Sequence, residues 1–178
     1  VIAGKFFGHL ALLSLAIIVG YGTAGLAIAA ISETSLAGQA WASFLGLIGS
    51  TIMLGAVFLA IGTMISARVR ERGTAAGLAI GAWLLFVLIY DLGFIGLLAS
   101  GLGEQLNDQL IAALLLANPT DVYRMLNLTG SSDAALLSGM SGLAGSSAIS
   151  PSVLVGLLAT WIVVPFTLAC VFFRRRQL

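Results

Sequence analysis

The stretch SARVRERGTAAG, residues 66–77, separates two long apolar runs and decides how the chain is arranged. Arg68, Arg70 and Arg72 fall close together here, in a chain in which 8% of the residues are charged and 60% are hydrophobic. A soluble domain has roughly 25% charged residues, and this chain has too few to cover a surface that faces water. The sequence therefore predicts an integral membrane protein in which this stretch connects two membrane spans.

Four apolar segments are long enough to span a bilayer, which requires about 20 mostly apolar residues. They cover residues 6–31, 41–66, 75–98 and 151–173. None of them alternates between apolar and polar residues as the strands of a membrane barrel do. Helices are the other way to satisfy backbone polar groups in lipid. The expected fold class is all-α, a polytopic membrane helix bundle that forms a single transmembrane domain over residues 1–178.

Basic residues predict the orientation of the bundle, because lysine and arginine are enriched in cytoplasmic loops. Four spans place seven basic residues on one side of the membrane, which we assign to the cytoplasm. They are Lys5, the three arginines of the loop and the three arginines of residues 174–176. The opposite side receives residues 32–39 and 99–150. That side holds one basic residue, Arg124, and five acidic ones: Glu33, Glu104, Asp108, Asp121 and Asp133.

The outer connection of residues 99–150 is too long for a structureless loop in a compact domain. Its segment EQLNDQLIAALLLA, residues 104–117, has an apolar face opposite a polar one, which predicts an amphipathic helix. The apolar face consists of Leu106, Leu110, Ile111 and Leu114.

The segment NPTDVYR, residues 118–124, predicts the start of a second outer helix. Asn118 is suited to the N-cap, Pro119 to the first helical position, and Asp121 lies three residues after the cap, as in a capping box. Together the two helices form an outer helical hairpin at the membrane surface. This hairpin is either a docking or gating surface, to which Tyr123 and Arg124 contribute, or a packed lid over the bundle.

The third span contains two further features. Gly73, Gly77 and Gly81 form a doubled GxxxG pattern, which favours close helix packing against either this chain or a second copy of it. Asp91 is the one acid inside a predicted span and lies roughly 24 Å along it, toward the outer interface. An intramembrane acid suggests a functional site, and a structural, hydrogen-bonded acid is the alternative.

Catalytic and metal-binding motifs are absent from the sequence. There is no GxxxxGK[ST] for ATP hydrolysis by a P-loop and no HExxH or CxxC. His9 is the single histidine, and the four methionines are scattered over different segments, which favours packing over copper binding. We therefore predict no catalytic residue, no metal site, no cofactor in this chain and no enzymatic activity. A net charge of +1 also argues against nucleic-acid binding.

Three parts of the sequence together resemble the C-terminal four helices of ABC-2-type ABC-transporter permeases. They are VIAGKFFGHL at residues 1–10, the loop SARVRERGTAAG, and the outer hairpin before a last span that ends in arginines. That family usually has six spans, so the resemblance implies that two N-terminal spans are missing from this sequence. Within the family, LLLANPTDVYRMLNL, residues 114–128, looks like the permeases that serve maturation of nitrous oxide reductase.

The resemblance implies a bacterial inner-membrane homodimer that binds separate ATPase subunits, which carry ATP and Mg²⁺, at its cytoplasmic side. It also implies a periplasmic partner at the outer face and a role in assembling the copper-sulfur centre of nitrous oxide reductase. The alternatives are a permease of another ABC-2 exporter, for a lipid or small molecule, and a membrane assembly scaffold that does not transport. By position, the ATPase-coupling residues would be Lys5, Arg68, Arg70, Glu71 and Arg72. The residues that dock the periplasmic partner would be Asn118, Asp121, Tyr123 and Arg124.

Overall fold

The computed structural model describes residues 2–31, 38–100, 107–128 and 149–176. All regular structure in these ranges is helical, which confirms the predicted all-α class. The long helices are α1 (Ile2–Ile31), α2 (Gly38–Arg68) and α9 (Pro151–Arg176). The third apolar segment consists of α3 (Arg72–Leu84), the π-helical segment η1 (Leu85–Ile89) and α4 (Tyr90–Ala99). Two shorter helices follow, α5 (Asp108–Ala117) and α6 (Pro119–Leu128).

Four helical segments in the described ranges are long and apolar enough to cross a membrane. They are Ile2–Ile31, Trp41–Arg68, Arg72–Ala99 and Pro151–Arg174, and each of them contains one of the four predicted spans. Many of their large apolar side chains are exposed, such as Leu12 at 69% and Leu92 at 65%. Exposed apolar side chains of this size are what a surface that faces lipid requires.

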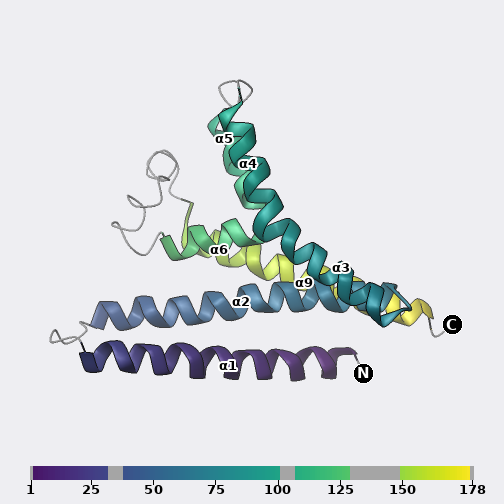
Figure 1. Cartoon of the computed structure of the whole chain (residues 1–178), viewed down its shortest axis with the longest axis horizontal. Helices are drawn as coiled ribbons and strands as arrows, with labels where there is room; N and C mark the ends of the chain where they lie inside the picture. Colours follow the sequence, from purple (N-terminus) through teal and green to yellow (C-terminus); the bar gives the residue numbers. More distant parts are fainter. Residues whose placement is uncertain (1, 32–37, 101–106, 129–148, 177–178) are drawn as a thin grey trace.

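Helix α2 is the centre of the bundle, because it packs against α1, α3, α6 and α9. The buried core lies between α2, α6 and α9. Figure 1 shows α1 and α2 running side by side, with both chain ends and the α2–α3 connection at one end of the molecule. The buried core residues are Val57, Ile61, Val122, Leu154 and Leu158.

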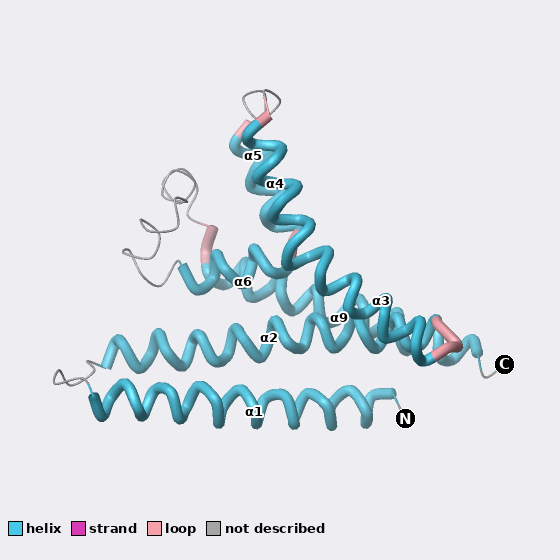
Figure 2. Tube along the Cα trace, in the orientation of Figure 1, coloured by secondary structure: helices cyan, strands magenta, loops and turns pink. Residues whose placement is uncertain are grey.

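The third span departs from the bundle along its length. Figure 2 shows α3 beginning beside the end of α2 and α4 rising away from α1 and α2, so that the chain changes direction at η1. Helix α5 returns toward the bundle, where α6 turns and packs against α2 and α9. The two outer helices predicted from the sequence are therefore present, and α6 is packed onto the bundle. Glu33, Glu104, Leu106 and Asp133 lie outside the described residues.

Candidate functional site

The π-helical segment η1 leaves one backbone carbonyl of the third span without its usual donor. The N–H of Tyr90 donates to the carbonyl of Leu85, five residues earlier, whereas an α-helix would direct it to Phe86. The Nδ2 of Asn118 donates to the Phe86 carbonyl at 3.0 Å. The irregular turn of the span is thus stabilised by the residue that begins α6.

Asn118 is fully buried and connects α5 to α6. Its Oδ1 accepts the N–H of Thr120 at 3.0 Å, and its carbonyl accepts the N–H of Val122 at 3.0 Å, so it is the N-cap predicted for this helix. Its Nδ2 also donates to Oδ2 of Asp121 at 2.9 Å. Asp121 therefore contacts the side-chain amide of the cap, where a capping box would use the backbone N–H.

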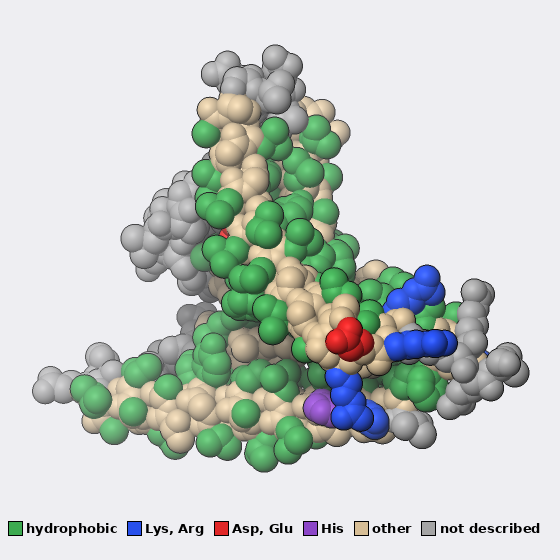
Figure 3. All heavy atoms as spheres, turned by 45° about the vertical axis from the view of Figure 1, so that its right-hand side comes forward, with side chains coloured by type: hydrophobic (Ala, Val, Ile, Leu, Met, Phe, Trp, Pro, Cys, Tyr) green, Lys and Arg blue, Asp and Glu red, His purple; other side chains and the backbone are tan. Residues whose placement is uncertain are grey.

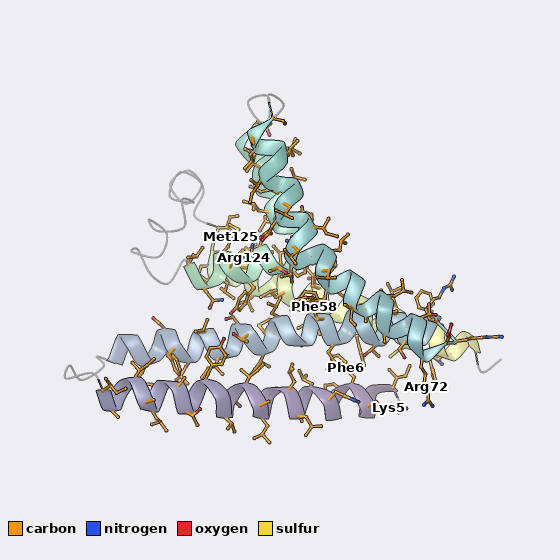
Figure 4. All side chains as sticks on the ribbon, viewed as in Figure 1. Lys5, Phe6, Phe58, Arg72, Arg124 and Met125 are labelled. Atoms are coloured by element: carbon orange, nitrogen blue, oxygen red, sulfur yellow. The ribbon has the colours of Figure 1, made fainter. Side chains whose placement is uncertain are left out.

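Three charged side chains meet beside this cap. Nη1 of Arg124 donates to Oδ2 of Asp91 at 2.5 Å and to Oδ1 of Asp121 at 3.1 Å. The side chains of Asp91 and Asp121 are 24% and 8% exposed, and that of Arg124 is 42% exposed. Figure 4 shows Arg124 and Met125 where α6 passes close to the third span. One guanidinium therefore neutralises only one of two carboxylates if both are ionised.

The pKa of Asp121 is raised, first because burial penalises its ionised form and second because Asp91 lies beside it. The hydrogen bond from Asn118 and the charge of Arg124 act in the opposite direction. The pKa of Asp121 is raised overall, so this carboxyl group keeps its proton to a higher pH than an ordinary aspartate does. The chemistry available to the three side chains is therefore charge pairing, hydrogen bonding and proton binding.

Two polar contacts attach α6 to α2. The hydroxyl of Tyr123 lies 3.1 Å from Oγ1 of Thr51, and the hydroxyl of Ser50 donates to Oδ1 of Asn127 at 2.9 Å. A third contact attaches α4 to α5, because the hydroxyl of Tyr90 donates to the carbonyl of Leu114 at 2.6 Å. Helix α6 is thus held to the third span, to α2 and to the core at the same time, as a packed lid would be.

The residues predicted to dock a periplasmic partner differ in their accessibility. Asn118 and Asp121 are buried, at 0% and 6% exposed, and their observed contacts are within the chain. Tyr123 and Arg124 are partly exposed. Of these four residues, Tyr123 and Arg124 are accessible, while Asn118 and Asp121 hold the helix that carries them.

The predicted coupling residues gather at the opposite end of the molecule. Lys5, Arg68, Arg70, Glu71 and Arg72 are all exposed there. Figure 3 shows lysine and arginine side chains together at this end, with the histidine beside them. Phe6 at the start of α1 packs on Phe166 of α9 with ring centroids 4.6 Å apart, and the Arg68 guanidinium lies 5.1 Å from the ring centroid of Phe172.

The predicted helix-packing glycines do not make close contacts with other helices among the described residues. A side chain at Gly77 or Gly81 would meet no described atom within 4 Å, and at Gly73 it would meet only Glu71. Close approach occurs at two other glycines, Gly25 against Phe44 and Gly55 against Leu13. The GxxxG pattern did not single out these two, because neither has another glycine four positions away.

Sequence reasoning also missed the pairing of Asp91 with Arg124. A signal was available, since Asp91 is the one acid inside a predicted span and Arg124 the one basic residue predicted on the outer side. Two isolated opposite charges near one interface are expected to meet. Across the described ranges, no group of three or more His, Cys, Asp or Glu side chains converges as metal ligands would.

The bundle, its basic end and the polar junction at α6 are features of a multi-pass membrane protein. A family model described as "ABC-2 family transporter protein" matches residues 1–178, and the chain belongs to this family. The protein described as "Probable ABC transporter permease protein NosY" from Stutzerimonas stutzeri is 41% identical over 176 residues, which are 99% of this chain and 63% of the relative. The protein of the same description from Pseudomonas aeruginosa is 42% identical over 175 residues, 98% of this chain and 63% of the relative.

The chain thus spans less than two thirds of the length of these curated relatives. The family and the four apolar helices place it as a multi-pass protein of the bacterial inner membrane.

Proposed function

We propose that this chain is the membrane-spanning part of an ABC transporter permease that couples ATP hydrolysis by a separate ATPase to a change at the periplasmic face. We further propose that it serves assembly of the copper-sulfur centre of nitrous oxide reductase. The likeness to two proteins described as NosY permeases supports both proposals. ATP and Mg²⁺ belong to the ATPase, and copper belongs to the reductase under assembly.

One observation carries the coupling proposal. The third span begins at Arg72, the last arginine of the basic loop, and continues as helix to Ala99. At Asp91 it is joined to Arg124 of α6. A displacement of the loop by an ATPase therefore has a helical path to α6, and the segment η1 is the irregular point at which that path bends.

The proposed partners follow from the two ends of this path. A NosF-like ATPase contacts the exposed residues Lys5, Arg68, Arg70, Glu71 and Arg72. A NosD-like periplasmic partner contacts the outer face at Tyr123 and Arg124. A second copy of the chain packs on the open face of Gly73, Gly77 and Gly81, where the described chain supplies no neighbour for Gly77 and Gly81.

The test is co-purification of the ATPase with the full-length permease in which Arg68, Arg70 and Arg72 are replaced by glutamate. We expect the ATPase to be lost from the complex, because the charge of the contact is reversed. Arg174→Glu is the matched control, since it reverses a charge at the same end outside the loop. A reporter fusion checks that the topology is unchanged. Retention of the ATPase by the correctly inserted triple variant would contradict the proposed contact.

A further inference from the structure

A cavity of about 380 Å³ opens at the basic end of the molecule between α1, α2 and the end of α9. Its walls include the aromatic rings of Phe6, Phe58 and Phe173, and its polar lining includes Lys5 and His9. A volume of this size is within the range of small-molecule and cofactor sites, about 300–1,000 Å³. Figure 4 places Phe6 between α1 and α2, with Lys5 beside it at the start of α1.

The cavity has basic residues at one end and apolar residues deeper inside. Leu59, on its wall, precedes Arg68 by nine residues, which is about 13 Å along a helix. The cavity therefore reaches from the level of the basic residues into the apolar part of the span. A water-soluble peptide or nucleotide would have to enter hydrocarbon to fill it, whereas a lipid has apolar chains of its own.

The rim of the cavity is suited to an anion. Lys5 is exposed, and neither ion pair of the described residues involves it. The Nδ1 of His9 lies 2.6 Å from the carbonyl oxygen of Lys5, and in the imidazolium form, in which both ring nitrogens carry a proton, Nδ1 donates to that carbonyl and Nε2 is left to donate to a phosphate. Basic pockets between membrane helices on the cytoplasmic side bind anionic lipid headgroups, and the cytoplasmic leaflet supplies such lipids.

We propose that this cavity binds one anionic phospholipid of the cytoplasmic leaflet. Lys5 and His9 contact its phosphate, and an acyl chain lies against Phe6, Phe58 and Leu59. The bound lipid fills the space between α1 and α2 at the end where Phe6 and Phe166 bring α1 to α9. The site shares Lys5 with the proposed ATPase contact, and its other lining residues belong to the permease alone, so it is tested in permease purified without the ATPase.

Gly62 provides a direct test, because it lines the cavity and a side chain there meets no described atom within 4 Å. Gly62→Leu should therefore fill the cavity without a clash inside the described chain. Gly156→Leu is the matched control, since Gly156 on α9 has equally open surroundings and is outside the cavity lining. Lys5→Glu removes the cation, Lys5→Arg keeps it, and Arg70→Glu reverses a nearby charge outside the cavity lining.

The measurement is native mass spectrometry of the full-length permease, purified without its ATPase from nanodiscs that contain phosphatidylglycerol or phosphatidylcholine. We expect the wild-type protein, Gly156→Leu, Lys5→Arg and Arg70→Glu to retain one phosphatidylglycerol. Gly62→Leu should lose the phosphatidylglycerol, and the fraction of Lys5→Glu that carries it should be at least about fivefold smaller. Equal retention of the two lipids by the wild-type protein would overturn the proposal, as would unchanged retention by both Gly62→Leu and Lys5→Glu. Equal retention of the two lipids is also the result expected if another segment of a longer chain, and not a lipid, occupies the cavity.

Discussion

Asp91 and Arg124 are 33 positions apart in the sequence, and their side chains meet at 2.5 Å. Their contact joins the third span to α6, and through α6 to the core between α2 and α9. Asp121 shares the same guanidinium at 3.1 Å. The outer helix is therefore fixed to the span by charge and to the bundle by apolar packing, and these two attachments can be tested separately.

Removal of the guanidinium should weaken the attachment of α6. Arg124→Gln leaves Asp91 and Asp121 without their shared cation, and because Arg124 is partly exposed we expect a loss of about 1–2 kcal/mol. This corresponds to a decrease in Tm of roughly 2–8 °C for a chain of this size, measured by thermal unfolding in detergent. Arg174→Gln, on the exposed end of α9, should leave Tm within about 1 °C. Equal shifts in both variants would show that the charge pair is not stabilising.

The raised pKa of Asp121 predicts a specific pH dependence. Between the ordinary carboxyl pKa and the raised one, the folded state binds more protons than the unfolded state. The free energy of unfolding should therefore decrease as the pH rises through the raised pKa, and be largest below the ordinary pKa. Asp121→Asn keeps an acceptor for the amide of Asn118 but cannot titrate, so it should flatten the dependence of Tm on pH.

Glu71→Gln is the control for this titration, because Glu71 is an exposed acid at the opposite end of the molecule. It should preserve the pH profile of the wild-type protein. If Asp121→Asn and the wild-type protein lose stability equally with rising pH, Asp121 is not the group responsible.

Asn118 should be more important for stability than an ordinary helix cap. Asn118→Ala removes the cap of α6 and the donor to Phe86, for a cost of about 2–3 kcal/mol in the free energy of unfolding. Asn107→Ala is the matched control, because Asn107 caps α5 by accepting one exposed hydrogen bond from the N–H of Leu110. This substitution should cost about 0.5–1 kcal/mol in the free energy of unfolding. Hydrogen exchange of the α6 amides measures both variants. Similar protection in the two would contradict the role of Asn118 at η1.

The open glycine face of α3 predicts a change in self-association. A leucine at position 77 has no described neighbour to clash with, so Gly77→Leu should leave Tm of the single chain nearly unchanged. If a second copy packs closely there, the dimer fraction in detergent should decrease at least about fivefold, as measured by light scattering. Gly156→Leu serves as the control on α9. An unaltered dimer fraction would place the contact elsewhere.

The spans could be predicted because they depend on local composition. The basic end could be predicted because it depends on which connections carry lysine and arginine. The start of α6 could be predicted because Asn118 and Pro119 act within one turn. The bend at η1 could not, because LFVLI contains no proline or glycine to mark it. The contact of Asp91 with Arg124 depends on that bend and on the return of α5, so no local pattern specifies it.

The proposed coupling can be tested by a charge exchange between Asp91 and Arg124, with the copper-sulfur centre content of nitrous oxide reductase from cells as the readout. The variants are Asp91→Arg, Arg124→Asp and the two combined, each made in the full-length protein and checked for equal amounts in the membrane. If the proposed coupling operates, each single variant should lower the content at least about tenfold. The combined variant, which restores one cation among two carboxylates, should recover most of it. Full content in both single variants, or no recovery in a combined variant that accumulates normally, would contradict the claim that this pair connects the third span to α6.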